Sequence, residues 1–430
     1  MRIAVCGANF LSMSEMSTTS ARTKSIRRKA VAFVLTMNET GLGVARSLGR
    51  ERIRVVGVDY VLESVGLRSR YCKPMLVPDP QEEPERVLKV LLTEGRKLDE
   101  RGILYLAGDA FGLFVSRYRK ELSECFRFIA PSPEGIFSKR LQYDEALRIG
   151  IPIASTFYPS TIDDVKRIKD SLKYPVFMKP YYSYLWLNKF GNKGFVIETP
   201  RQLMDRFNEV LPTGLQVMIQ SIIPGQSMNI ISVRVYIGTR GEILALFVAQ
   251  KTRQHPTDFG TGTFTKSVHN EEVTRLSLDF LRGLGYRGIC DIEFKKDPRD
   301  GQYKLIELNP RFWTQTIQAT HAGVNFPLIQ YMDLTGEPVR PITDFKDGVT
   351  WLDSWHDLLA FQDNWKKGRT SVTEFLKSWS GIDCHAHLAL DDLGPVLAML
   401  AKRRRELIIR LRRYLSESES WKAASGGKTA

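Results

Sequence analysis

Paired cysteines and membrane-length apolar runs are both missing from this 430-residue sequence. Its cysteines are odd in number and scattered, at Cys6, Cys72, Cys125, Cys290 and Cys384. That arrangement excludes the disulfide framework of a small secreted domain. No apolar run approaches the roughly 18 residues that a membrane-spanning helix requires. We therefore expect unlinked thiols in a reducing compartment, and a cytoplasmic protein.

Net positive charge is small in the body of the sequence, although the formal net charge of the whole chain is +14. Two tracts, Arg22–Lys29 and Ala401–Arg413, carry net charges of five and six, so the rest of the chain is nearly balanced. A protein that reads nucleic acid would instead spread Lys and Arg over its folded body. We therefore expect no nucleic-acid partner.

The two ends of the chain differ from its middle. Residues 1–29 join a short apolar patch to Ser, Thr and basic residues. We interpret them as a disordered extension, or one read from an upstream start codon, with an organellar transit peptide as the alternative. From Asp391 the sequence predicts a basic helix with leucines on one face, at Leu400, Leu407, Leu411 and Leu415. Such a helix either docks on the protein or makes weak contact with an anionic membrane surface.

Hydrophobic periodicity divides the rest into three regions. Residues 30–133 begin with an apolar strand, a turn containing glycine, a helix and a second strand that ends at Asp59, which is a βαβ unit of a parallel sheet. Residues 134–340 mix helices with antiparallel hairpins, and residues 341–430 read as a helical C-terminal region with the basic tail. The expected fold class is therefore α/β followed by α+β.

The strongest chemical signal is a predicted hairpin that carries two glutamates. One strand contains Glu293, and the next contains Glu307-Leu-Asn309-Pro-Arg311. Because side chains alternate along strands, pairing these two strands brings Glu293 beside Glu307 and Asn309. Three oxygen-bearing side chains suit Mg²⁺, with Mn²⁺ as a substitute, and Arg311 follows on the same face. The sequence thus predicts a metal site with an arginine next to it.

In these residues the sequence resembles the ATP-grasp superfamily, over roughly residues 31–340. The resemblance also includes Ser138-Lys139 at the start of a helix, the strand that delivers Lys179, and the stretch Gln220–Gly225. It implies an ATP-grasp fold behind a Rossmann-like parallel-sheet domain, with Glu293, Glu307 and Asn309 holding the metal. Lys139 and Lys179 would bind ATP phosphates, and the base would lie against Gln220, Ser221, Ile222 and Ile223. Superfamily members usually have glutamate where this chain has Ser221.

A loop over the phosphates is also implied by the resemblance. We expect it at Asn188–Gly194, with Lys193 near its end. Loops of this kind are usually richer in glycine. The aromatic stretch Tyr181–Trp186 before it serves either to stack on a substrate or to pack, and the sequence leaves both interpretations open.

Two further basic residues, Lys251 and Arg253, share one face of a predicted strand ahead of a Gly/Thr turn. On that face they would grip the transferring γ-phosphate and an acyl phosphate, together with Arg311. The alternative is an ordinary strand end with exposed basic side chains.

The predicted function is ATP-dependent ligation of a carboxylate to an amine through an acyl phosphate. The chain resembles ATP-grasp enzymes that include D-aspartate ligases and related carboxylate–amine ligases. This resemblance implies MgATP as cofactor, amino-acid or peptide-like substrates and a homodimer as one assembly. A carboxylase or carbamoyl-phosphate-type enzyme is the first alternative. A nucleotide-binding or membrane-surface module without catalysis is the second.

Overall fold

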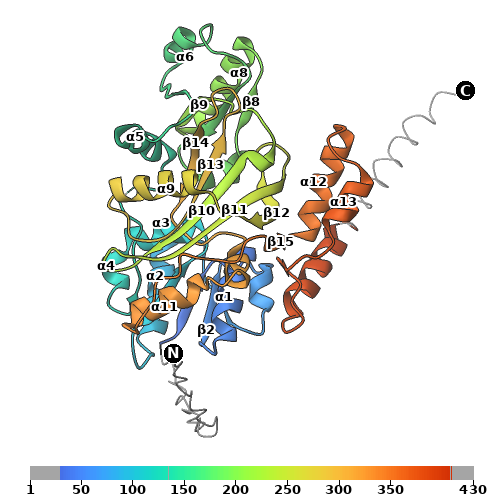
Figure 1. Ribbon diagram of the computed structural model, residues 1–430. Helices are drawn as coiled ribbons and strands as arrows, with labels where there is room; N and C mark the ends of the chain where they lie inside the picture. The colour runs from blue at the N-terminus through green and yellow to red at the C-terminus, as the bar shows by residue number, and fades with distance from the viewer. Residues whose placement is uncertain (1–29, 134, 407, 409–430) are drawn as a thin grey trace, which may run out of the picture.

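In the computed structural model the described residues are 30–133, 135–406 and 408. They form three sheets with helices packed around them, followed by a mainly helical C-terminal region (Figure 1). The expected extension over residues 1–29 lies outside the described residues.

The N-terminal sheet is parallel, with strand order β3-β2-β1-β4-β5. Its strands are β1 (Ala32–Leu35), β2 (Val55–Asp59), β3 (Lys73–Leu76), β4 (Gly102–Leu106) and β5 (Phe126–Arg127). The helices of this region are α1 (Glu39–Arg50), α2 (Pro84–Gly95), α3 (Asp109–Arg117), α4 (Arg119–Leu122) and the short 3-10 turn η1 (Val65–Arg68). Every residue of β1 is buried, as its continuous apolar run predicted. The parallel sheet is therefore confirmed.

A smaller antiparallel sheet follows, in the order β6-β9-β7-β8. It contains β6 (Thr156–Phe157), β7 (Val176–Pro180), β8 (Phe195–Ile197) and β9 (Val217–Ser221), with α6 (Ile162–Ile168), α7 (Ser183–Phe190), α8 (Pro200–Val210) and η2 (Leu211–Thr213). Val176 and Met178 of β7 belong to the buried core on one face. Since side chains alternate along a strand, Phe177 and Lys179 point to the opposite, inner face.

The largest sheet has the order β14-β13-β10-β11-β12-β15-β16. Its strands are β10 (Ile230–Ile237), β11 (Ile243–His255), β12 (Thr261–Ser267), β13 (Gly288–Lys296), β14 (Tyr303–Asn309), β15 (Thr350–Leu352) and β16 (Cys384–His385). Around it lie α5 (Lys139–Ile149), η3 (Ser227–Asn229), α9 (Glu271–Gly283), α10 (Thr316–His321) and α11 (Phe326–Thr335). Both predicted hairpins, β10–β11 and β13–β14, are present and antiparallel. The mixed α/β fold is therefore confirmed.

The C-terminal region is not entirely helical. It contributes β15 and β16 to the edge of the large sheet before and after the helices α12 (Ser354–Lys366) and α13 (Val372–Ser378). A last helix occupies residues 394–406, so it starts three residues later than predicted. Asp391 and Asp392 stay outside it because their carboxylates bind Arg50 and Arg46 of α1. None of the helices within the described residues has the length and apolar character to cross a bilayer.

One predicted loop is partly helical. The stretch Asn188–Phe190, expected in the phosphate-covering loop, is the last turn of α7. Trp186 is fully buried against Phe190 and Phe195, and these aromatic contacts hold the helix together up to the left-handed Gly191. Within the aromatic stretch Tyr181–Trp186, the Trp186 ring therefore packs in the protein core.

Candidate functional site

The acidic hairpin has the predicted register. Glu293 of β13 lies directly opposite Glu307 of β14, and Asp291 lies opposite Asn309. The two glutamates therefore share one face of the large sheet, and Asn309 is two residues from Glu307 on that face. The Asn309 amide donates to a Glu307 oxygen at 3.2 Å. The structure thus brings the three predicted metal ligands together.

Each glutamate is paired with a lysine from another strand or helix. The Lys251 ammonium of β11 lies 2.6 Å from Glu293, and Lys139 at the start of α5 pairs with Glu307. Burial alone would raise the pKa of Glu307, but the positive charges of Lys139 and Lys193 outweigh it and hold that pKa well below its usual range. Glu307 is therefore a carboxylate at neutral pH and ready to bind a cation.

The donor set fits magnesium. In the part of the chain that the structure describes, no three His, Cys, Asp or Glu side chains gather as a metal cluster. The two glutamates and the Asn309 carbonyl oxygen therefore supply only part of a shell. Mg²⁺ is commonly held by one or two carboxylates, with its remaining positions filled by water and substrate phosphates. The residues present fit a metal that arrives with a nucleotide.

Lys179 lies on the inner face of β7, beside this cluster. Its ammonium donates to the Tyr143 hydroxyl at 2.5 Å, and that hydroxyl donates to the Ile306 carbonyl at 2.5 Å. Burial and the nearby charge of Lys139 lower the pKa of Lys179 to about 7. A phosphate anion bound next to the Lys179 ammonium would stabilise its charged form and so offset the effect of burial.

The predicted base-binding stretch forms the end of β9 and the turn after it. The Gln220 amide donates to the Thr156 hydroxyl at 2.8 Å, and the Ser221 backbone N–H donates to the Ser155 carbonyl at 2.9 Å. The Ile223 carbonyl accepts from Lys295 at 2.8 Å. Because the Gln220 side chain is already bound, contacts to a base would come from backbone groups and from Ile222 and Ile223.

The loop after α7 reaches across to the large sheet. The Lys193 ammonium lies 3.4 Å from the Thr261 hydroxyl at the start of β12. Gly194 approaches β7 so closely that an added side chain would meet the Met178 carbonyl at 2.4 Å. Glycine is therefore required at the point where the loop rejoins the small sheet.

A second contact between the small and the large sheet could not be predicted from the sequence. The rings of Phe177 on β7 and Phe259, in the turn between β11 and β12, are stacked with centroids 4.4 Å apart and planes at 3°. Asp258 beside it accepts from Lys367 at 3.1 Å and Arg369 at 2.8 Å, just after α12. No residue spacing signals such a pair, because the two rings are 82 positions apart in the sequence.

Lys251 and Arg253 do not act together as predicted. Lys251 points to Glu293, whereas Arg253 forms a two-point ion pair with Asp357 of α12. The register of β11 and β12 shifts between these two residues, a bulge that turns Arg253 away from the Lys251 face. The structure therefore places Lys251 in the acidic cluster and Arg253 at the contact with the C-terminal region.

Arg311 lies between the N-terminal region and the acidic hairpin. It is paired with Asp109, the first residue of α3 in the connection after β4, and its guanidinium donates to the Asn309 side-chain oxygen at 3.4 Å. Asp109, Lys139, Ser183, Tyr184 and Asn309 are among the residues that line a small pocket here. The carboxyl ends of parallel strands are common ligand sites, and that rule could have identified Asp109 from the sequence.

A buried ion pair lies under the same face. Arg234 of β10 is 2.7 Å from Asp291, and its guanidinium lies 3.4 Å from the Gln315 side chain, which in turn donates to the Gly262 carbonyl. Burial raises the pKa of Asp291, and Arg234 opposes that rise. This pair was not predicted, because the sequence does not show that Arg234 and Asp291 are directly opposite in β10 and β13.

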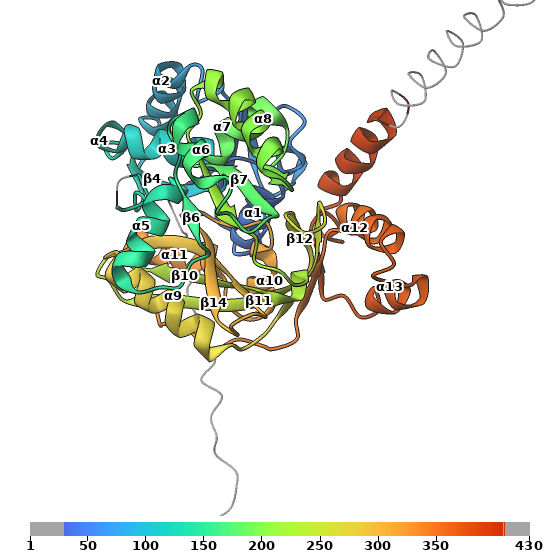
Figure 2. The ribbon, with the colours of Figure 1, turned by 90° about the horizontal axis from the view of Figure 1, so that it is seen from above.

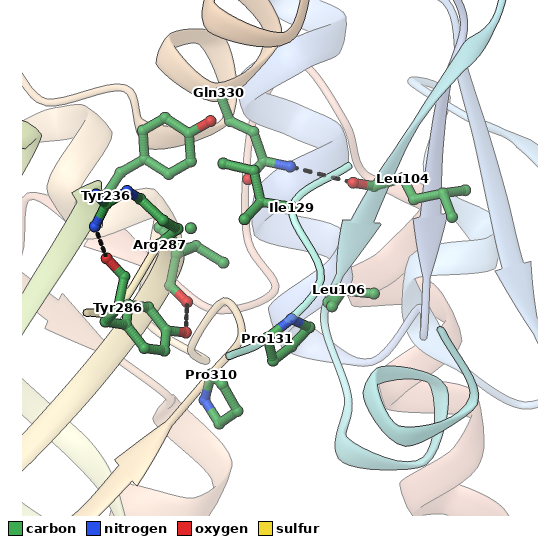
Figure 3. Close-up of a pocket in the computed structure, with 11 residues that line it drawn as sticks. Leu104, Leu106, Ile129, Pro131, Tyr236, Tyr286, Arg287, Pro310 and Gln330 are labelled. Carbon is green, nitrogen blue, oxygen red and sulfur yellow. Dashed lines mark hydrogen bonds between the residues drawn. The ribbon is translucent and has the colours of Figure 1, made fainter. Parts of the chain in front are cut away.

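Another pocket, shown in Figure 3, lies on the other side of Pro310. Leu104, Leu106, Ile129 and Pro131 give it apolar walls, and the Gln330 amide that borders it donates to the Leu104 carbonyl at 3.1 Å. None of its lining residues is acidic, so it does not share the chemistry of the Glu293–Glu307 cluster.

The chain is similar to known proteins in sequence and in fold. The family model of the carbamoyl-phosphate synthase L chain, ATP binding domain, matches residues 261–332, which include the acidic hairpin. A D-aspartate ligase of Enterococcus faecium is 24% identical over 283 residues, covering 60% of this chain and 66% of the relative. The chain thus spans slightly less than two thirds of that relative's length.

Two solved structures show the same fold. One is the biotin carboxylase domain of Hydrogenobacter thermophilus 2-oxoglutarate carboxylase, a dimer in complex with MgADP, ADP and bicarbonate. Its TM-score is 0.59 at 16% identity, with 74% of each chain covered. The other is the L-amino acid ligase of Bacillus licheniformis, with a TM-score of 0.55 at 14% identity and 73% and 78% covered. The fold and site of this chain together resemble those of ATP-grasp proteins. Its sequence relatives include the D-aspartate ligase.

Proposed function

We propose that the protein is an ATP-dependent ligase that joins a carboxylate to an amine. The observation that carries the proposal is the pairing of Glu293 with Glu307 across β13 and β14, with Asn309 beside them and Lys139, Lys179 and Lys251 around them. This arrangement offers a divalent cation and a triphosphate complementary charges at the same place. Similarity to the D-aspartate ligase supports amide formation over other uses of ATP.

The first chemical step is attack of a substrate carboxylate oxygen on the γ-phosphorus of ATP. The bond from that phosphorus to the β,γ-bridging oxygen breaks, and ADP leaves with the electron pair. Lys139 and Lys179 offset the phosphate charges, and Lys251 and Arg311 face the transferring group. Glu293, Glu307 and Asn309 would hold Mg²⁺, which would offset the negative charge of the phosphates. Mn²⁺ would substitute at the same ligands.

In the second step the amine nitrogen attacks the acyl carbon and inorganic phosphate leaves. The nitrogen loses one proton, so the products are an amide, ADP and phosphate. We propose that the organic substrates approach from the side of the small pocket at Asp109, Tyr184 and Asn309, where Arg311 pairs with Asp109. For Arg253 we propose a positioning role through Asp357 in place of direct contact with phosphate.

The proposal also includes a division into domains, a cellular location and an assembly. We propose residues 30–133, 134–340 and 341–430 of the sequence as the N-terminal, ATP-grasp and C-terminal parts. A cytoplasmic location and a homodimer are proposed with them. The dimeric carboxylase domain with the same fold supports the assembly.

The experiment is a screen for ADP release with amino acids, small carboxylates and bicarbonate, each with and without an amine. Glu307→Gln is expected to lower ADP release by about 10²- to 10³-fold, as loss of a group that stabilises transition-state charge does. Glu209→Gln, on the exposed side of α8, is the matched control and is expected to act as the parent. Hydroxylamine trapping reports the acyl phosphate as a hydroxamate.

Three outcomes would contradict parts of this proposal. Unchanged ADP release by Glu307→Gln would refute the assigned metal site. Activity with bicarbonate but with no organic carboxylate would favour the carboxylase alternative. ADP release that depends on no acid at all would favour nucleotide binding without ligation.

A further inference from the structure

The last described helix, residues 394–406, rests on α12 through one side only. Arg403 lies over the Trp355 ring, 5.0 Å from its centre, and its guanidinium is 3.4 Å from the His356 ring nitrogen. Pro395, in the first turn, is also buried. Beyond these contacts the helix extends past α12, away from the three sheets (Figure 2).

The free side of this helix carries leucines. Leu393 is 49% exposed, Leu397 is 62%, Leu400 is 56% and Ile408 is 38%. Their spacing of four, seven and fifteen residues from Leu393 places them on one stripe of a helix. A helix on the surface of a globular protein normally packs its apolar face against the protein core. An apolar stripe that stays exposed is therefore available to contact another apolar surface.

Leu390 extends the stripe into the preceding turn. It is 91% exposed although its neighbours Asp391 and Asp392 are fixed to α1 by their carboxylates. The anchored aspartates therefore hold an apolar side chain out into solvent at the base of the helix.

Positive charge lies along the stripe. Lys402, Arg404 and Arg405 are exposed, and Arg404 falls between Leu400 and Ile408 on the apolar side. A second copy of the helix would bring these cations toward their equivalents, which is unfavourable without a counter-charge. An anionic lipid surface provides the apolar layer for the leucines and phosphates for the cations, whose long stems reach back to the headgroups.

We propose that the stripe formed by Leu390, Leu393, Leu397, Leu400 and Ile408 lies on an anionic lipid surface. This surface contact is independent of the proposed ligase reaction, because the stripe belongs to the C-terminal region and includes no residue of the acidic cluster. The helix lies in the plane of the interface and does not span it.

The test is co-sedimentation of the full chain with vesicles. One set is phosphatidylcholine alone and the other contains about one quarter phosphatidylglycerol. The parent is expected to bind the anionic vesicles and to be released by salt, because screening weakens the cationic part of the contact. The double variant Leu397→Asp with Leu400→Asp is expected to bind these vesicles at least about tenfold more weakly, because it lacks two leucines that would be partly buried in the lipid layer.

Leu376→Asp is the matched control, because this leucine of α13 is 63% exposed and outside the stripe. It is expected to bind vesicles as the parent does. Circular dichroism and the melting temperature of each variant confirm that the fold is kept. ADP release by the double variant is expected to be unchanged, so failure of this proposal is distinguishable from failure of the ligase proposal.

Several results would overturn the proposal. These are equal binding to both vesicle sets, no binding to either, or binding that the double variant keeps. Sedimentation velocity without lipid then measures the oligomeric state of the parent and of the double variant. If the parent is a dimer without lipid and the double variant a monomer, the stripe is a contact between two copies of the chain.

Discussion

Arg253 and Asp357 form a two-point ion pair that joins β11 to α12, with N···O distances of 2.8 and 2.6 Å. Asp357 is completely buried and also accepts from the Thr263 hydroxyl and the Trp379 indole, both at 2.8 Å. Four donors use the whole acceptor capacity of one carboxylate. The pair therefore fixes the C-terminal helices against the strands that carry Lys251 and the Gly/Thr turn.

Asp357→Asn is expected to destabilise the protein strongly. The change leaves the Arg253 guanidinium partly buried without its counter-charge, and breaking one side of a buried pair typically costs about 3–5 kcal/mol. Urea unfolding followed by circular dichroism measures the loss. Asp163→Asn is the matched control, since Asp163 pairs with Lys166 on the exposed surface of α6, where the loss is about 1 kcal/mol or less. A loss at Asp357 no larger than at Asp163 would contradict the positioning role.

The same pair shows where sequence reasoning succeeds and where it stops. The β13–β14 hairpin was predictable because alternation and a short turn determine which residues face each other, and Glu293 duly lies opposite Glu307. Arg253 and Asp357 are 104 positions apart, and no local pattern links them. The bulge in β11 that turns Arg253 depends on the register with β12, which the sequence does not reveal.

Helix α7 gives the other lesson. The resemblance implied a loop from Asn188. In the structure the Trp186 ring packs against Phe190 and Phe195, and the burial of these large rings stabilises a helix where the loop was expected. The start of the last helix was misplaced for a similar reason. Asp392 is bound by Arg46 at 2.9 Å, a contact 346 positions away that local helix propensity ignores.

Lys179 is expected to take up a proton when nucleotide binds. Its pKa is lowered to about 7 in the free protein, so at about pH 8 most of the population is neutral. Phosphates beside the ammonium raise that pKa, and binding therefore adds up to one proton per site above pH 7 and almost none at about pH 5.5. Titration calorimetry of ADP at about pH 8, in two buffers with different ionisation enthalpies, measures the uptake.

Lys179→Arg is the control for that measurement. Arginine stays charged at every pH used, so the variant keeps the positive charge and is expected to bind ADP without the uptake. Equal uptake by the parent and the variant would show that another group takes the proton. The low pKa assigned to Lys179 would then have no role in binding.

Phe259→Ala is expected to tighten ADP binding. The Phe259 ring covers Phe177 on the inner face of β7, two residues before Lys179, where the resemblance places the nucleotide. A base that uses this face must displace the ring, and a stacked aromatic pair is worth about 0.5–1.5 kcal/mol, or about two- to tenfold in affinity. The dissociation constant of ADP measures the effect. Phe361→Ala removes a stacked pair with Phe375 in the C-terminal helices and is expected to leave ADP affinity unchanged. Weaker binding by Phe259→Ala would mean that Phe259 stays in place and contacts the nucleotide.

Arg311→Lys is expected to separate nucleotide binding from phosphoryl transfer. Arg311 is held by Asp109 and Asn309 at the edge of the acidic cluster, where we propose that the γ-phosphate meets the substrate carboxylate. Lysine keeps the charge but loses the planar fork that contacts two oxygens at once, and such a loss costs about 10²-fold in kcat when it acts on the transition state. Because we propose that Arg311 contacts the transferring phosphoryl group and not ADP, the dissociation constant of ADP is expected to stay within about threefold of the parent. Steady-state ADP release and ADP calorimetry on the same preparation give both quantities. A large rise in the ADP dissociation constant with kcat unchanged would move Arg311 from the reacting phosphate to the bound nucleotide.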